Sequence, residues 1–121
     1  MHVGPNTSLI VSNNTVINNN SGSGINVFLN SSAFVWRDVL LQGNQAGIKA
    51  VMNSGVVLED VEISNNNTGI HLVRDSSANL VTGVTINGSG SWGIFCDDTE
   101  SSYENDSSPI TDSVSCTDFN Q

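Results

Sequence analysis

Three basic side chains and one aromatic ring have the chemistry to bind a sugar. Lys49, His71 and Arg74 could pair with the carboxylate of an acidic sugar. His71 could also act as a general acid or base near neutral pH. Trp92 stands just before Gly93 in an expected turn, where an exposed ring would stack on a sugar face. Lys49, His71, Arg74 and Trp92 are therefore the candidate ligand-binding residues.

An acidic run offers two further chemistries. Asp97 and Asp98 are the residue type that glycoside hydrolases use, one carboxylate to activate water and the other to protonate the leaving group. Together with Glu100 they present hard oxygen ligands of the kind that Ca²⁺ prefers. The run matches no EF-hand or Gly-Gly-x-Gly-x-Asp repeat, so an acidic loop without a ligand is the alternative. No other cofactor is indicated.

A repeat of about 23 residues must position these groups. A Val-x-Ile run (Thr15-Val16-Ile17 in the first copy and Val39-Leu40-Leu41 in the second), an Asn-rich turn and Gly-Ile recur four times, starting at Thr15, Val39, Val61 and Val84. Such a period is typical of stacked-coil architectures. Each copy contains three short runs rich in β-branched residues, which favours strands over helices. We therefore predict an all-β, right-handed, single-stranded parallel β-helix of about four to five coils of roughly 23 residues, with three parallel sheets.

Recurring positions predict how the coils stack. Three apolar columns should face the core, and one column should face outward. Asn20, Asn44 and Asn66 occupy one turn position, where asparagine suits a left-handed backbone and its stacked amides can bond from coil to coil. The glycine before each Gly-Ile isoleucine indicates either positive φ or a close backbone approach. The columns are Val39, Val61 and Val84; Leu41, Ile63 and Ile86; Ile25, Ile48, Ile70 and Ile94; and, facing outward, Asn26, Lys49, His71 and Phe95.

These columns resemble the right-handed parallel β-helix repeat proteins of the pectate-lyase-like superfamily. The resemblance spans about Leu9 to Asp98 and implies carbohydrate binding or cleavage on an outer face. The Gly-His-Gly and Arg-x-Lys motifs that accompany the paired aspartates of polygalacturonase-like hydrolases are absent. Leucine-rich repeats are the competing solenoid, but the leucine they require two residues after the asparagine is missing.

The last part of the chain departs from the repeat. Residues 97–109 are polar and acidic, and aligning Val84 with Val114 requires an insertion of about seven residues, so we expect a surface loop there. Cys96 and Cys116 flank it and form either one bridge or two buried thiols. Residues 1–121 read as a single β-helix domain, a fragment of a longer solenoid, since the repeat is already under way by Leu9 and no signal peptide precedes it.

Composition limits the partners. Three basic against twelve acidic residues give a net charge of −9, which argues against nucleic acid, and no apolar run is long enough for membrane insertion. We expect neighbouring coils or a second chain to cover the open ends. Seven Asn-x-Ser/Thr sequons suggest a secreted or cell-surface location. They lie at Asn6, Asn13, Asn19, Asn30, Asn66, Asn87 and Asn105.

The favoured hypothesis is a structural or carbohydrate-binding β-helix module that binds a polysaccharide or glycan through one outer face. No complete catalytic set is visible in the sequence. The alternative is a fragment of a polysaccharide lyase, glycoside hydrolase or epimerase that acts on an acidic polysaccharide, with His71, Asp97 and Asp98 as catalytic candidates.

Overall fold

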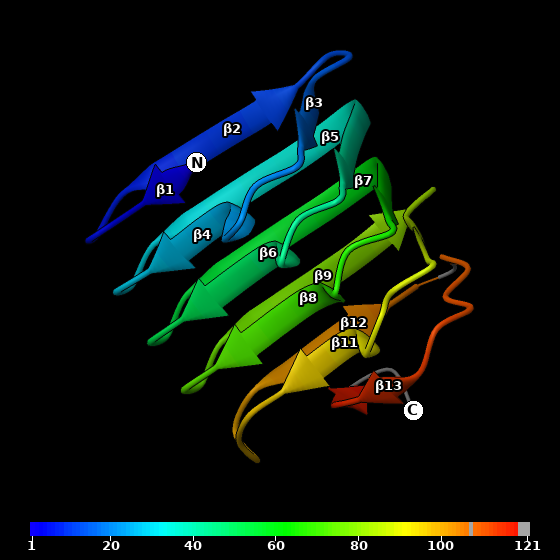
Figure 1. Cartoon of the computed structure of the whole chain (residues 1–121). Helices are drawn as coiled ribbons and strands as arrows, with labels where there is room; N and C mark the ends of the chain where they lie inside the picture. Colours follow the sequence, from blue (N-terminus) through cyan, green and yellow to red (C-terminus); the bar gives the residue numbers. More distant parts are fainter. Residues whose placement is uncertain (107, 119–121) are drawn as a thin grey trace.

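The chain forms a solenoid of parallel strands. A computed structural model describes residues 1–106 and 108–118. It shows about five turns of about 23 residues, stacked along one axis (Figure 1). The described residues contain no helix, which confirms the predicted β-solenoid and excludes a leucine-rich repeat of strands and helices. None of the described segments is a helix able to cross a membrane.

In the described residues, fourteen strands make two parallel sheets. A six-stranded sheet has the order β1-β4-β6-β8-β11-β13. An eight-stranded sheet has the order β14-β12-β9-β7-β5-β2, with β10 beside β7 and β3 beside β5. The strands are β1 (His2–Val3), β2 (Ser8–Ser12), β3 (Val16–Asn18), β4 (Ser23–Phe28), β5 (Ser32–Gln42), β6 (Ala46–Val51), β7 (Gly55–Ser64), β8 (Thr68–Val73), β9 (Ser77–Thr82), β10 (Thr85–Asn87), β11 (Trp92–Cys96), β12 (Ser102–Asn105), β13 (Val114–Ser115) and β14 (Thr117–Asp118).

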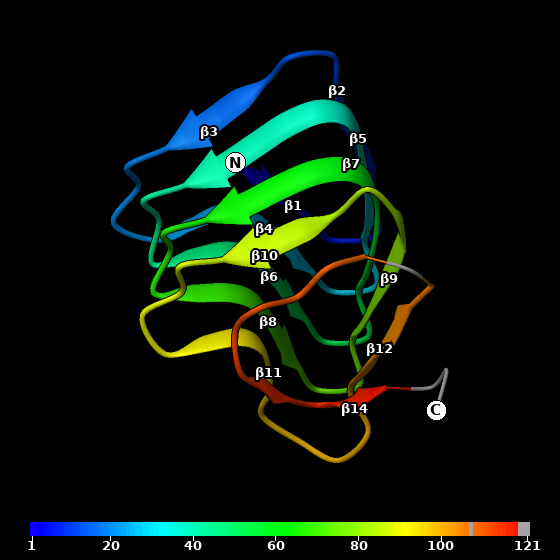
Figure 2. The ribbon, with the colours of Figure 1, turned by 90° about the vertical axis from the view of Figure 1, so that its right-hand side faces the viewer.

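Each full coil has the three predicted strand runs, but two of them share one sheet. In β5 and β7 the first two runs are continuous and bend at a corner, so three faces arise from two hydrogen-bonded sheets (Figure 2). Arg37 and Asp38 make the corner of β5 with φ values of 64° and 62°. Asp60 makes the corner of β7 with a φ of 53°. Left-handed residues of this kind turn the chain while the strand on each side keeps its neighbours.

The core consists of the predicted inward columns. The isoleucines of the Gly-Ile column are paired from coil to coil in β4, β6, β8 and β11, and all four are fully buried. The column of Leu41, Ile63 and Ile86 is equally buried, and that of Val39, Val61 and Val84 is at most 1 % exposed. Stacking like residues fills the narrow interior with few voids and fixes the register of the strands.

An asparagine ladder fixes one corner. Asn20 donates from its backbone N–H and Nδ2 to Oδ1 of Asn44, at 3.1 and 2.8 Å. Asn44 donates in the same way to Oδ1 of Asn66, at 2.9 and 3.1 Å. The expected left-handed backbone is not at these asparagines. It falls one residue earlier, at Asn19, Gly43, Asn65 and Gly88. The ladder residues are therefore selected for their amides, while the preceding position makes the turn.

The repeated glycine before each isoleucine allows close stacking. A Cβ built on Gly24 would lie 2.8 Å from the carbonyl oxygen of Gly47, and one on Gly47 would lie 2.7 Å from that of Gly69. Neither glycine has a positive φ. The close backbone approach is thus the correct alternative of the two predicted, because any side chain here would push neighbouring coils apart.

A serine ladder, which the sequence reading missed, lines another corner. The backbone N–H of Ser31 donates to Oγ of Ser54, that of Ser54 to Ser76, and that of Ser76 to Ser101, at 3.0 to 3.3 Å. All four serines are buried. Their spacing repeats with the coil, so the same periodicity that revealed the asparagines could have revealed them.

The predicted loop insertion at 97–109 is wrong for one stretch, Ser102–Asn105. Ser102–Asn105 forms β12, which pairs in parallel with β9, and Tyr103 of β12 is 8 % exposed in the core. Ile110 stacks on Ile86, and Val114 pairs with Ile94 instead of continuing the Val84 column. The error arose because a Val-x-Cys run fits either column. The acidic segment therefore continues the solenoid beyond a short turn at residues 97–101.

One disulfide joins Cys96 at the end of β11 to Cys116 after β13. It therefore links the fourth strand of the Gly-Ile column to the fifth, with a Cα–Cα distance of 4.9 Å. The bridged alternative is thus the one the structure adopts. At the other end of the solenoid, β1, β2 and β3 have neighbours on one side only in the described chain, so the coverage of this edge stays a prediction.

Candidate functional site

A groove of about 490 Å³ lies on the outer face of the six-stranded sheet. Strands β6, β8 and β11 provide its floor, and the turns before them provide its rim. It contains three of the four residues predicted to bind a ligand, Lys49, His71 and Trp92. Its other lining residues are Gly22, Ser23, Gln45, Ala46, Thr68, Ser91 and Phe95.

Strand alternation explains why these side chains meet. Ile48, Ile70 and Ile94 point into the core, so the following residue of each strand must point outward. Lys49 pairs with His71, and His71 with Phe95, in the predicted outward column. Neighbouring strands lie about 4.8 Å apart, so each coil adds one side chain to this column at that spacing.

Two rings form an aromatic wall at one end of the groove. Trp92 and Phe95 stack with centroids 6.0 Å apart and an interplanar angle of 24°. Phe95 also contacts His71, with centroids 5.3 Å apart and an angle of 47°. All three side chains are half-buried, so each keeps an accessible surface while its neighbours restrict its motion.

His71 has an acidic partner. Its Nε2 lies 2.9 Å from Oδ2 of Asp97, which follows β11 directly. The side chains are 22 % and 42 % exposed. A carboxylate on one ring nitrogen fixes the ring orientation and favours a proton on that nitrogen. His71 and Asp97 thus form an oriented imidazole and carboxylate beside the groove, and they are two of the three residues predicted as catalytic candidates.

Asp98 has a different position and a structural role. Its Oδ1 accepts the backbone N–H of Ser101 at 2.8 Å, and its Oδ2 accepts that of Asp75 at 3.2 Å. Partial burial alone would raise the pKa of Asp98, but the hydrogen bonds from the side chain and backbone of Ser101 and from the backbone of Arg74 and Asp75 together lower it. The carboxylate closes the turn at residues 97–101 and is not paired with Asp97 for hydrolysis.

The calcium candidates are not gathered into a site. Asp97 contacts His71, Asp98 closes its own turn, and Glu100 is exposed. Within residues 1–106 and 108–118, no group of three or more His, Cys, Asp or Glu side chains is placed to hold a metal ion.

Arg74 also lies outside the groove. It follows β8 at a corner with a φ of 56° and is exposed. It was predicted to lie with Lys49 and His71 because it comes a little further along the strand run that carries the outward column. The corner turns it away from the sheet face, and it is not among the groove residues. Gln45, Thr68 and Ser91 were missed, although Thr68 shares the column of Trp92.

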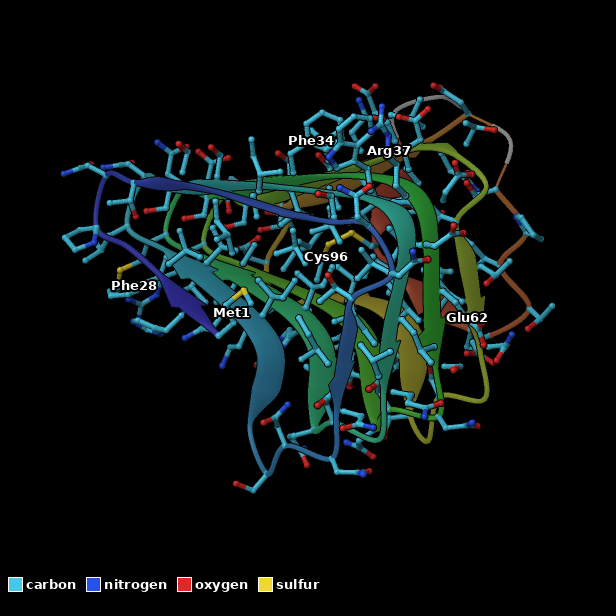
Figure 3. The ribbon with its side chains drawn as sticks, turned by 90° about the horizontal axis from the view of Figure 1, so that it is seen from above. Met1, Phe28, Phe34, Arg37, Glu62 and Cys96 are labelled. Atoms are coloured by element: carbon cyan, nitrogen blue, oxygen red, sulfur yellow. A yellow bond between two sulfur atoms is a disulfide. The ribbon has the colours of Figure 1, made fainter. Side chains whose placement is uncertain are left out.

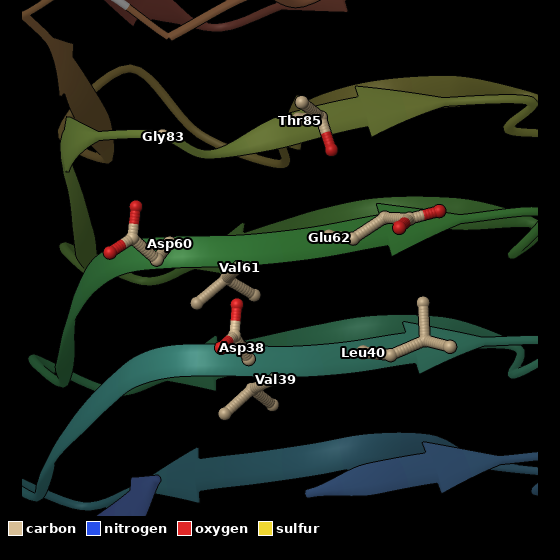
Figure 4. A pocket seen from close by; sticks show the side chains of 8 residues that line it. All are labelled: Asp38, Val39, Leu40, Asp60, Val61, Glu62, Gly83 and Thr85. Atoms are coloured by element: carbon tan, nitrogen blue, oxygen red, sulfur yellow. The ribbon is translucent and has the colours of Figure 1, made fainter. Parts of the chain in front are cut away.

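A second hollow, of about 340 Å³, lies over β5, β7 and β10 on another face (Figure 4). It carries three carboxylates, from Asp38, Asp60 and Glu62, and no basic residue lines it. No metal-binding group was found there in the described part of the chain. The groove with Lys49 and His71 and this acidic hollow therefore lie on two different faces.

The strand order, the coil period and the parallel pairing define a β-solenoid of the β-helix class, with its groove on one outer face. The chain matches the family model for a right handed beta helix region over residues 1–115, so it belongs to the right-handed β-helix family. No curated protein and no solved structure matches it.

Proposed function

We propose that this β-helix is a carbohydrate-binding module, and that the groove over β6, β8 and β11 binds an acidic glycan. The observation that carries the proposal is the stacked pair of Trp92 and Phe95 beside Lys49 and His71 in one groove. Aromatic rings pack against the C–H faces of sugars, and nearby polar groups fix orientation. Gln45, Thr68 and Ser91 supply such groups at the rim.

The charge distribution supports an acidic sugar over a neutral one. The chain has a net charge of −9, yet the outward column of the six-stranded sheet carries His2, Lys49 and His71. Asp97 is the acidic group beside this column in the groove region, and it contacts His71. A carboxylate or sulfate on the glycan would meet Lys49 there while the rest of the surface repels it.

The first test is a glycan array with neutral and acidic oligosaccharides. We expect the chain to bind acidic members of the array. Trp92→Ala should lower the affinity at least about tenfold, which corresponds to about 1.4 kcal/mol of binding free energy. Val16→Ala is the control, because it removes an exposed apolar side chain from a different face. Equal losses in both variants, or no binding by the wild-type chain, would contradict the proposal.

The contact between His71 and Asp97 favours a second candidate function, cleavage of the bound glycan. A base oriented by a carboxylate can take a proton from a substrate, and the two side chains are within hydrogen-bond reach. Acidic polysaccharide incubated with the chain would then yield new reducing ends or unsaturated products. His71→Asn should abolish this product while Trp92 keeps the glycan bound. Binding without any product assigns the groove to recognition alone.

A secreted or cell-surface location belongs to the same proposal. The Cys96–Cys116 bridge supports it, since disulfides persist in oxidising compartments. Five sequons at exposed positions, Asn6, Asn13, Asn19, Asn30 and Asn87, would accept glycans without disturbing the core. Asn66, by contrast, is 2 % exposed in the ladder and would not. Tracking the full-length tagged protein in its native cell tests this location, and a purely cytosolic signal would contradict it.

A further inference from the structure

An apolar patch lies on the outer face of the eight-stranded sheet, away from the groove. Ile10, Phe34 and Val57 form one outward column across β2, β5 and β7. They are 68 %, 37 % and 36 % exposed. Trp36 lies two residues along β5 and contacts Phe34, with ring centroids 5.3 Å apart. Inward residues of the same strands, such as Val35 and Leu58, are fully buried, so the patch is a separate surface and not part of the core.

Opposite charges flank this patch at one end. The Arg37 guanidinium lies 3.7 Å above the Trp36 ring, and Figure 3 shows Phe34 and Arg37 projecting from the same side of the molecule. Glu59 lies beside Trp36 on the next strand. Among the described residues, neither Arg37 nor Glu59 has a salt-bridge partner. Both charges therefore remain available to a partner that presents the opposite arrangement.

We propose that this patch is the interface of a homodimer, in which a second copy of the chain docks face to face. A two-fold axis that runs parallel to the strands, midway between β5 and β7, makes the patch of one copy complementary to the same patch of the other. It sets Phe34 of each copy on Val57 of the other, and Arg37 of each copy against Glu59 of the other. Each contact then occurs twice, as an isologous interface requires.

Charge complementarity selects a second copy as the occupant. The patch itself is uncharged, and the axis sets its flanking Arg37 and Glu59 against each other, while Asp38 and Asp60 at the same corners line the hollow on the other face. The axis sets β9, the neighbour of β7, opposite β2. These four strands (β2, β5, β7 and β9), with about five residues each, give a face of about 16 Å by 19 Å, less than the about 800 Å² per partner of a standard interface. The dimer is therefore weak, with a Kd in the micromolar range or above.

Sedimentation equilibrium of the full chain from about 1 µM to about 1 mM, the range that weak complexes populate, tests the proposal. We expect the mean mass to rise toward twice that of the monomer. Phe34→Asp should raise the Kd at least tenfold. Val16→Asp is the control, because Val16 is 56 % exposed on a different face and its variant should dimerise as the wild type does. A monomer at all concentrations, or equal loss in both variants, overturns the proposal.

A charge exchange tests the orientation of the two copies. Arg37→Glu and Glu59→Arg should each raise the Kd about tenfold or more, because like charges then face each other across the axis. The double variant should recover to within about threefold of the wild type, since the pair is restored with reversed polarity. Circular dichroism and thermal melts show whether each variant is folded. Weakening by the single variants without recovery in the double variant overturns the proposed axis.

Discussion

The groove over β6, β8 and β11 and the hollow over β5, β7 and β10 are built on the same solenoid but have opposite chemistry. The groove has about 490 Å³ and contains Lys49, His71 and two aromatic rings. The hollow has about 340 Å³ and contains three carboxylates beside Val39, Val61 and Leu40. Both are shallow depressions between outward side chains of successive coils. Size and backbone therefore do not distinguish them, whereas the outward residues do.

The contrast follows from how a solenoid uses its sequence. Inward positions must match from coil to coil, because each side chain packs on its equivalent above and below. Outward positions face water and are free to differ, so Asn26, Lys49, His71 and Phe95 share one column. In this chain the inward columns specify the fold, and the outward columns specify what each face can bind.

The largest effect should come from breaking the scaffold that both faces share. In Asn66→Ala, the backbone N–H of Asn44 and the carbonyl of Leu41 lose their buried partners. At about 1 to 3 kcal/mol for each of these two unsatisfied groups, the free energy of unfolding should fall by about 2 to 6 kcal/mol. Urea denaturation followed by circular dichroism measures this change.

Asn20→Ala is the matched control for the ladder. Asn20 lies at the exposed edge and donates to Asn44 without accepting a ladder bond in return. Its loss should cost less than about 1 kcal/mol, because water can replace the amide there. Similar costs for Asn20→Ala and Asn66→Ala would show that burial of the ladder does not set its contribution.

The next effect distinguishes local charge from total charge. Lys49→Glu in the groove and Glu62→Lys in the acidic hollow each change the net charge by two, in opposite directions. We expect Lys49→Glu to weaken binding of an acidic glycan about tenfold or more. Glu62→Lys should change it by about twofold or less, because the two faces point in different directions and salt screens charges beyond about 8 to 10 Å.

Titration calorimetry at two salt concentrations measures both affinities. The Lys49→Glu loss should shrink at high salt, whereas the contribution of Trp92 should not. If Glu62→Lys strengthened binding as much as Lys49→Glu weakened it, the net charge of the molecule would control recognition, and the contrast between the two faces would have no functional meaning.

The fold could be predicted from the sequence because its strongest constraint is periodic. Burial of Ile25, Ile48, Ile70 and Ile94 requires the same residue type at each repeat, which makes the inward columns visible in one chain. Alternation then predicts the outward column that contains Lys49 and His71. Features that do not repeat were harder to predict: β12 carries Ser102 and Tyr103 in place of β-branched residues, and its polar neighbours resemble a loop.

The site was only partly predictable for a similar reason. Groove residues on strands follow from the period, but corners decide where neighbouring residues point. Arg74 lies three residues after His71 and is turned away by left-handed backbone, and Asp98 follows Asp97 yet binds a different segment. The sequence does not show where the side chains of Arg74 and Asp98 point. An arginine has no preference of its own for left-handed φ, so the backbone at Arg74 is set by stacking on neighbouring coils.

The smallest effect should be the pH dependence of the turn that borders the groove. Folding lowers the pKa of Asp98, so its carboxylate stabilises the native state above the unfolded value of about 3.9. This contribution disappears as the pH falls through the lower native pKa, where Asp98 becomes protonated in both states.

At pH 7, Asp98→Asn should lower the free energy of unfolding by at most about 1 kcal/mol, because water screens this partly exposed group. The difference between variant and wild type should approach zero as the pH falls below the lowered native pKa, since both side chains are then neutral. Glu100→Gln, an exposed change in the same turn, is the control and should show no such trend. Urea titrations at a series of pH values measure the difference, and a constant cost from pH 7 to pH 3 would show that Asp98 acts through its shape and not its charge.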